Sequence, residues 1–222
     1  MKTRSTLNRE LQTLNDKTLQ MASMVNEALD KAMHALISRD VLTAREIMAN
    51  DTAVNELRYD IEDLAIIVIA TQQPMARDLR WIIAAIHIAV ELERIGDHAA
   101  DIASLAERVE NEGDFDTLHK LPKMANRAGD MVQTAVTAFI QQDAEMARKI
   151  IRRDEKLDRH YRLLRQETLA AMVDDDYIRR ANFLLWAGHD LERIGDRATN
   201  IAERVIFMIT NEHIELTERD DS

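Results

Sequence analysis

Apolar residues recur at steps of three and four along most of the chain, which is the spacing of one face of an α-helix. In the first segment the pattern is carried by Leu7, Leu11, Leu14, Met21, Val25, Ala28, Ala32, Ala35 and Leu36. No stretch of useful length alternates apolar and polar residues, as a half-buried strand would. The pattern therefore predicts an all-α protein.

Capping and breaking residues divide this pattern into separate helices. Ser-Arg-Asp at 38–40 interrupts the first helix, and Asp40 is a suitable N-cap for a second helix that reaches about residue 71. Pro74 fits the first turn of a third helix, which extends to about residue 111. Asp143 is the matching N-cap in the second part of the chain. The helices expected there span roughly 116–141, 143–173 and 176–212.

The two parts of the chain are related in sequence. The hexapeptide Leu-Glu-Arg-Ile-Gly-Asp occurs at 92–97 and again at 191–196. Residues 28–55 also align without a gap on residues 131–158. The repeat predicts two tandem pseudo-repeated antiparallel three-helix bundles with six long helices in all, and we place the two halves at 1–112 and 113–222.

Composition and charge narrow the class of protein. The chain of 222 residues is 46% hydrophobic and has only 5 Gly and 2 Pro, which suits a helical protein. It has no Cys, so disulfides and thiolate metal sites are excluded. The net charge of −11 disfavours nucleic acid as a partner. No apolar run approaches the ~20 residues of a membrane span, and the N-terminus has no secretory h-region, so we expect a cytoplasmic protein without a direct membrane span.

The repeated hexapeptide places acidic side chains one helical turn apart. Residues four apart on a helix are separated by only about 40°, so each copy forms a stripe of oxygen-bearing side chains. The first stripe is Glu93, Asp97 and Asp101, and the second is Glu192, Asp196 and Asn200. The preceding helices carry the pairs Asp51/Asn55 and Asp154/Asp158. In an antiparallel bundle these helices are neighbours, so each half is expected to bring its oxygen ligands together for Mg, Mn, Fe or Zn.

A solvated acidic face without a ligand is the alternative interpretation of these stripes. However, like charges at this spacing repel by roughly 0.2–0.5 kcal/mol. Gly96 and Gly195, at matching positions within the stripes, each cost about 1 kcal/mol relative to Ala in a helix. A solubilising face needs no glycine, whereas the close approach of another backbone or of a bound group would explain both.

Other site types have weaker support. None of the seven His residues has Glu three positions before it, which disfavours a ferritin-like di-iron site. His189–Asp190 is a dipeptide of metal phosphohydrolases, but no second His-rich element accompanies it. His98 is expected at the surface, and Arg94 and Arg193 are expected to pair with neighbouring helices. The chain has no nucleophile elbow, P-loop or dinucleotide fingerprint.

The twin hexapeptides, each on the third helix of its half, and the stretch QQPMARDLR at 72–80 resemble the PhoU family over about residues 5–212. The resemblance implies a cytoplasmic, non-catalytic negative regulator of phosphate homeostasis that represses the phosphate-starvation response when phosphate is plentiful. Its implied partners are the ATPase of a phosphate ABC transporter and a phosphate-sensing histidine kinase. The resemblance also implies a homodimer with metal clusters at E/D-x-x-x-D motifs.

Carried over residue by residue, those motifs fall on Glu93/Asp97, Glu192/Asp196, Asp51/Asn55 and Asp154/Asp158. Asn55 and Asn200 depart from the fully acidic pattern, so equal affinity of the two halves for metal is in doubt. Three function classes stay open: an adaptor, a metal-dependent phosphohydrolase and a metal buffer. The absence of a convincing catalytic base favours the adaptor.

Overall fold

The computed structural model describes residues 2–110, 112, 120–170 and 175–212. These residues form six α-helices and no strand. The helices are α1 (Lys2–Ser38), α2 (Val41–Gln72), α3 (Arg77–Val109), α4 (Leu121–Gln141), α5 (Ala144–Ala170) and α6 (Asp175–Thr210). None of the described helices combines the length and apolarity that a membrane crossing requires.

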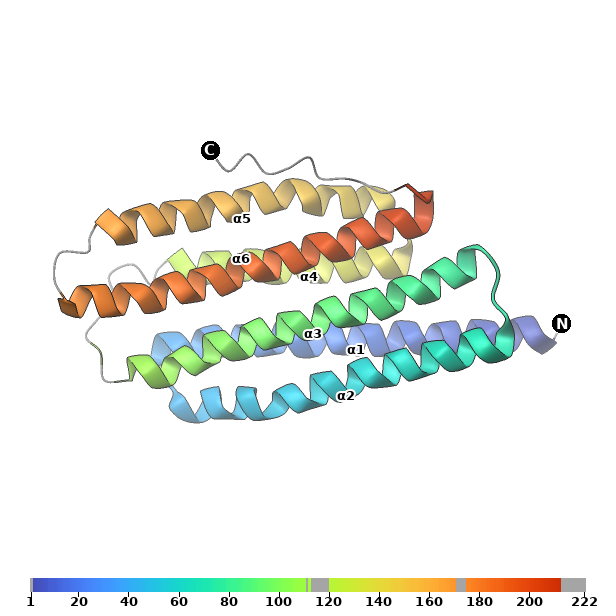
Figure 1. Ribbon diagram of the computed structural model, residues 1–222, viewed down its shortest axis with the longest axis horizontal. Helices are drawn as coiled ribbons and strands as arrows, with labels where there is room; N and C mark the ends of the chain where they lie inside the picture. The colour runs from blue at the N-terminus through green and yellow to red at the C-terminus, as the bar shows by residue number, and fades with distance from the viewer. Residues whose placement is uncertain (1, 111, 113–119, 171–174, 213–222) are drawn as a thin grey trace.

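The helices form two three-helix bundles that lie along each other (Figure 1). Helices α1, α2 and α3 all pack against one another, and in the second half α6 packs against both α4 and α5, which also contact each other. The bundles are joined by two pairs, α3 with α6 and α1 with α4. The predicted fold class is confirmed, whereas the boundary between 112 and 113 stays a prediction next to residues outside the described ranges.

Both predicted aspartate caps are present. The side chain of Asp40 accepts hydrogen bonds from the backbone N–H groups of Leu42 and Thr43, each at 3.1 Å. Asp143 Oδ1 accepts one from the Met146 N–H at 2.9 Å. These bonds satisfy donors that the first turns of α2 and α5 leave without intrahelical partners, so each cap fixes where its helix begins.

The predicted start of the third helix is wrong. Helix α2 ends at Gln72, Gln73 adopts a left-handed conformation with φ of 48°, and α3 begins only at Arg77. Pro74 therefore lies in the connection, where its fixed φ suits an extended chain as well as a first helical turn. The proline that does occupy the first turn of a helix lies at the start of α4. The predicted helix ends near 116 and 173 fall outside the described residues.

The core is aliphatic and rich in alanine, especially where the bundles meet. Helix α3 alone buries Ala84, Ala85, Ala89, Ala99, Ala103 and Ala106. Small side chains let long helices approach closely, so α3 can pack at once against α1, α2 and α6. Because of this central position, polar residues of α3 can contact either α2 or α6.

Candidate metal centre

The second half brings three of the predicted ligands together. Asp154 and Asp158 from α5 and Asp196 from α6 each offer a carboxylate oxygen, and these atoms lie within 4.8 Å of one another. Asp154 is only 5% exposed. Like charges this close repel strongly when they are withdrawn from water, and a bound cation would offset that repulsion. An oxygen-only ligand set of this kind suits hard or borderline cations.

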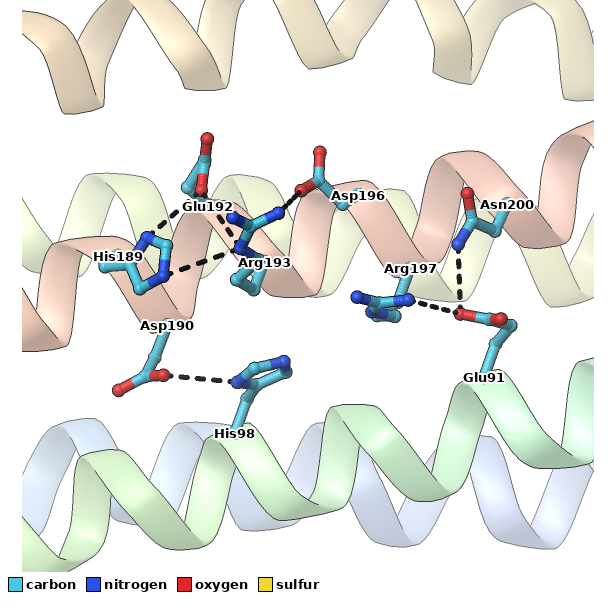
Figure 2. A network of polar contacts seen from close by, with 9 residues as sticks. All are labelled: Glu91, His98, His189, Asp190, Glu192, Arg193, Asp196, Arg197 and Asn200. Atoms are coloured by element: carbon cyan, nitrogen blue, oxygen red, sulfur yellow. Dashed lines mark hydrogen bonds and ion pairs between the residues drawn. The ribbon is translucent and has the colours of Figure 1, made fainter.

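Glu192 adds a fourth carboxylate beside this group. It lies one helical turn before Asp196, and its side chain is 16% exposed. Burial raises the pKa of Glu192, and the neighbouring Asp196 raises it further. Arg193 offsets part of this charge, because its Nε lies 3.8 Å from Glu192 Oε2. Nδ1 of His189 lies 3.4 Å from the same oxygen. Figure 2 shows Glu192 and Asp196 on the side of α6 that faces away from α3.

The first half is arranged differently at the corresponding place. Asn55 occupies the position of Asp158 and donates a hydrogen bond to Asp51 Oδ2 at 3.2 Å. Burial raises the pKa of Asp97, and Asp51 raises it further, so these carboxylates also face each other across α2 and α3. Among the described residues, however, no three acidic side chains meet here within 4.8 Å.

An arginine that the sequence analysis did not consider reaches Glu93. Arg58 Nε lies 3.5 Å from Glu93 Oε1, and its Nη1 lies 2.7 Å from Glu62 Oε1. The corresponding residue in the second half is Tyr161, whose pKa is raised by burial and then by Glu192. The alignment of the two halves could have revealed this difference, because Arg58 follows the Asp51/Asn55 pair within a single turn of Asn55.

Asp101 and Asn200 lie apart from the two carboxylate groups. Asp101 lies close to His98, which is also on α3, and to Asp190 of α6. One ligand atom from each of the three residues lies within 4.8 Å of the other two. Asn200 Nδ2 donates to Glu91 Oε2 of α3 at 3.2 Å. Each step of four residues rotates the side chain by about 40° around the helix axis. The third member of each stripe therefore points about 80° away from the first. It therefore faces the other bundle.

The contact between the bundles is built from related pairs (Figure 2). His98 Nδ1 lies 3.1 Å from Asp190 Oδ1, and at the equivalent place Arg197 Nη1 lies 3.4 Å from Glu91 Oε2. The prediction that His98 is a surface residue is wrong, because its side chain is only 22% exposed between α3 and α6. The sequence pattern indicated Asp190 only as part of the His189–Asp190 dipeptide and did not predict that Asp190 and Glu91 take part in this contact, although both are acidic at matching positions of the repeat.

The arginines of the hexapeptides pair within their own helices. Arg94 Nη1 lies 3.7 Å from Glu91, and Arg193 Nη1 lies 3.1 Å from Asp196 Oδ2. The expectation of partners on neighbouring helices is therefore wrong for both residues. The spacing of three residues along a helix already places these side chains side by side.

The two glycines of the hexapeptides have different surroundings. A Cβ on Gly195 would lie 2.4 Å from Leu157 Cδ2 and 3.1 Å from Asp154 Oδ1. A Cβ on Gly96 would meet nothing closer than Val54 Cγ1 at 3.4 Å, which is ordinary contact. The close approach expected at both positions thus holds only for Gly195, and there it involves side chains of α5 and not another backbone.

Comparison with known proteins gives consistent results. The family model described as "PhoU domain" matches residues 18–106 and again residues 121–205. The chain is 32% identical to the phosphate-specific transport system accessory protein PhoU homolog of Clostridium acetobutylicum, covering 97% of this chain and 100% of that protein. It is 34% identical to the homolog of Pseudomonas aeruginosa, covering 95% of this chain and 89% of that protein.

Solved structures agree with the sequence comparisons. The crystal structure of PhoU from Pseudomonas aeruginosa matches with a TM-score of 0.86 at 33% identity, over 92% of this chain and 99% of that chain. The phosphate transport system regulatory protein PhoU from Streptococcus pneumoniae matches with a TM-score of 0.88 at 30% identity, over 95% of this chain and 100% of that chain. The similarity therefore includes both bundles and the contact between them.

Proposed function

This chain belongs to the PhoU family, and from that premise we propose that it is a non-catalytic negative regulator of phosphate homeostasis. It acts in the cytoplasm, where it couples the ATPase of a phosphate ABC transporter to a phosphate-sensing histidine kinase. It represses the phosphate-starvation response when phosphate is plentiful. The observation that carries the proposal is the similarity to accessory proteins of phosphate-specific transport over 97% and 95% of the chain.

The surface supports a protein that acts by contact. Helix α2 exposes Tyr59, Ile66 and Ile67, each by more than half of its surface. Large apolar side chains gathered on one exposed helix favour a protein partner or a second copy of the chain, and we include a homodimer in the proposal. The net charge of −11 favours basic surfaces on the regulatory partners and speeds encounter at low salt.

We also include metal binding at the two carboxylate groups, with Mg, Mn, Fe or Zn as the ion. In the second half the cluster of Asp154, Asp158 and Asp196 supports it, since its oxygens converge within 4.8 Å. In the first half Asp51 Oδ1 and Asn55 Oδ1 are buried and accept no hydrogen bond from the described part of the chain. Buried oxygens of this kind are costly without a partner and are suitable ligands for a cation. The bound ion would neutralise the carboxylates and tie the facing helices together.

Gene deletion in the source organism tests the regulatory proposal. Deletion is expected to raise alkaline phosphatase expression in phosphate-rich medium, and the intact gene supplied in trans should restore repression. Variants that lack the carboxylates but remain folded then report whether metal is needed for repression. Normal repression in the deletion strain, together with turnover of a phosphoester by the purified protein, would instead support a metal-dependent phosphohydrolase.

A further inference from the structure

A basic groove runs between α4 and α5, lined by residues other than those of the carboxylate cluster. Four cationic side chains line it, two from each helix: Lys123, Arg127, Arg153 and Lys156. Asp130 is the only acidic residue of the lining, and the cavity measures about 340 Å³. This concentration of positive charge is unusual in a chain whose net charge is −11.

The cations of this groove are not neutralised by neighbours. Within the described ranges, Lys123, Arg127 and Lys156 form no ion pair within 4.0 Å. Arg153 donates from Nη1 to the hydroxyl of Thr134 at 3.3 Å, a contact that positions the guanidinium without cancelling its charge. Cationic side chains that are paired with carboxylates produce only a weak positive potential. These four produce a net positive potential in the groove, which attracts anions.

The first half contains a corresponding groove in which Lys31 is the cation of the described lining, and Lys31 pairs with Glu27 at 2.7 Å. Pairing residue 28 with 131 places Met24 opposite Arg127, Asn50 opposite Arg153, and Ala53 opposite Lys156. Met24, Asn50 and Ala53 do line a cavity of about 270 Å³ between α1 and α2. The packing of the paired helices therefore produces a groove in both halves, and among the described lining residues an excess of positive over negative charge occurs in the second half only.

We propose that the α4–α5 groove binds a soluble anion that carries two or more adjacent phosphate groups. Lys and Arg are the side chains that bind phosphate oxygens best, as a compact charge and as a planar fork of donors. One phosphate group carries a charge of about −1.5 to −2 near neutral pH. Four cations against one carboxylate exceed that charge, so a ligand with several phosphates matches the groove better than orthophosphate does. This assignment does not rest on the regulatory role proposed above.

Isothermal titration of the full chain with inorganic tripolyphosphate tests the proposal. One saturable site per chain is expected at physiological salt, with orthophosphate binding more weakly. Substituting the first-half residues, as in Arg127→Met with Arg153→Asn, should lower the affinity by about 10-fold or more, since two charge-assisted contacts are lost. The matched control is Arg9→Met with Arg165→Asn, which removes two exposed cations outside the groove and should change affinity less than about 2-fold.

Three further arms decide between interpretations. Lys123→Gln with Lys156→Ala removes the other two cations and should weaken binding similarly, which keeps the test valid if the first double variant does not fold. Binding should persist in EDTA, because a metal bridge to the carboxylate cluster is not required. Absence of a saturable site, equal loss in the control variant, or loss in EDTA would overturn the proposal. So would groove-dependent sedimentation with phosphatidylglycerol vesicles in the absence of tripolyphosphate binding, which would assign the groove to lipid headgroups.

Discussion

The two halves carry the same hexapeptide at the same place in the same bundle, yet they build different carboxylate groups. In the second half Asp154, Asp158 and Asp196 converge within 4.8 Å. In the first half Asn55 replaces one acid. There Arg58 also lies 3.5 Å from Glu93. The hexapeptide therefore contributes the same side chains to both halves. The charge that remains for a cation depends on the facing helix and on the hexapeptide arginine, which pairs with Asp196 in the second half and with Glu91 in the first.

This difference indicates that the two sites are not equivalent in affinity. A cation is attracted by the charge left after local pairing, and a guanidinium beside a carboxylate competes for the same oxygens. Tyr161, which stands in the second half where the first has Arg58, brings no positive charge. We therefore expect the second half to bind metal more tightly, and the following experiments test that order.

The largest effect is expected from Asp154→Asn combined with Asp158→Asn. Amides keep the shape but lose the charge, so metal affinity of the second half should fall by about 100-fold or more. At a metal concentration 100 times the wild-type Kd, a 100-fold loss of affinity removes about 2.3 kcal/mol of stabilisation. Thermal melts with and without metal check the loss. The metal-free variant should be at least as stable as the metal-free parent, because repulsion around the buried Asp154 is relieved.

The matched variant in the first half is Glu93→Gln with Asp97→Asn. It should lower the metal content of that half only, with a smaller loss of metal-dependent stability. Elemental analysis of both variants gives the stoichiometry. Unchanged metal content in both would show that the stripes are polar faces without a ligand.

Gly195→Ala should destabilise the protein more than Gly96→Ala does. The new methyl group at 195 would lie 2.4 Å from Leu157 Cδ2, and Leu157 is fully buried. Repacking costs about 1–3 kcal/mol, which exceeds the ~1 kcal/mol that Ala gains over Gly in a helix. At Gly96 the contacts are ordinary, so Ala should be neutral or slightly stabilising. Chemical denaturation compares the two, and equal losses would contradict the difference in packing.

Replacing the residues of α2 that face the first hexapeptide by their second-half counterparts should raise the metal affinity of the first half. Asn55→Asp with Arg58→Tyr gives the first half the residues of the second. The change adds one carboxylate and removes the cation that pairs with Glu93, so metal affinity of that half should rise by about 10-fold. Titration in the background of Asp154→Asn and Asp158→Asn isolates this site. An unchanged affinity would mean that neither residue controls it.

The sequence predicted the helices well because their signals are local. The apolar period and the side-chain caps of Asp40 and Asp143 act within one or two turns. Pro74 misled because its φ suits either a helix start or a connection. For the candidate site, the i, i+4 spacing predicted that Asp154, Asp158 and Asp196 would converge, and their carboxylate oxygens do lie within 4.8 Å of one another. The pairing of Arg58 with Glu93 depends on how α2 and α3 are rotated, which no local pattern contains.

The same rotation explains the contact between the bundles. Treating each stripe as straight placed Asp101 with Glu93, whereas the drift of the helix carries it to His98 and Asp190. The residues of that contact, Glu91 and His98 among them, are determined by how α3 packs against α6, which the sequence of either helix alone does not contain. The duplication relates the two ends of this contact, because the pair of His98 with Asp190 implies an equivalent pair of Arg197 with Glu91.

The smallest effect is the pH dependence of the metal-free protein. Burial raises the pKa of Glu192, and Asp196 raises it further, while Glu93 is raised by burial and Asp97. Arg58 opposes the rise at Glu93. A carboxyl whose pKa is higher in the folded state binds more protons there than in the unfolded chain, so its contribution to stability falls as pH rises. In EDTA the contribution of these carboxyls to the melting temperature should therefore increase as pH is lowered from 7 toward 4.5, the ordinary value for Glu. It is measured as the difference between the parent and the Glu192→Gln variant.

Metal should reverse the sign of this dependence, because a cation binds only the deprotonated carboxylates and competes with the protons. With saturating metal, stability should increase as pH rises over the same range. Glu192→Gln should change the slope in EDTA more than Glu93→Gln does, since the Glu192 side chain is 16% exposed and that of Glu93 is 22% exposed. Among the groups with a lowered pKa, Asp40 and Glu27 act only near and below their ordinary values of 3.8 and 4.5. Burial lowers the pKa of His87 and His160 from 6.5, so these two residues make the folded state less stable as pH falls and oppose the carboxyl contribution. Both histidines are present in the parent and in the variants, so the difference between the slopes isolates the carboxyls. A slope that added metal leaves unchanged in the parent would show that the carboxylates do not share a bound ion.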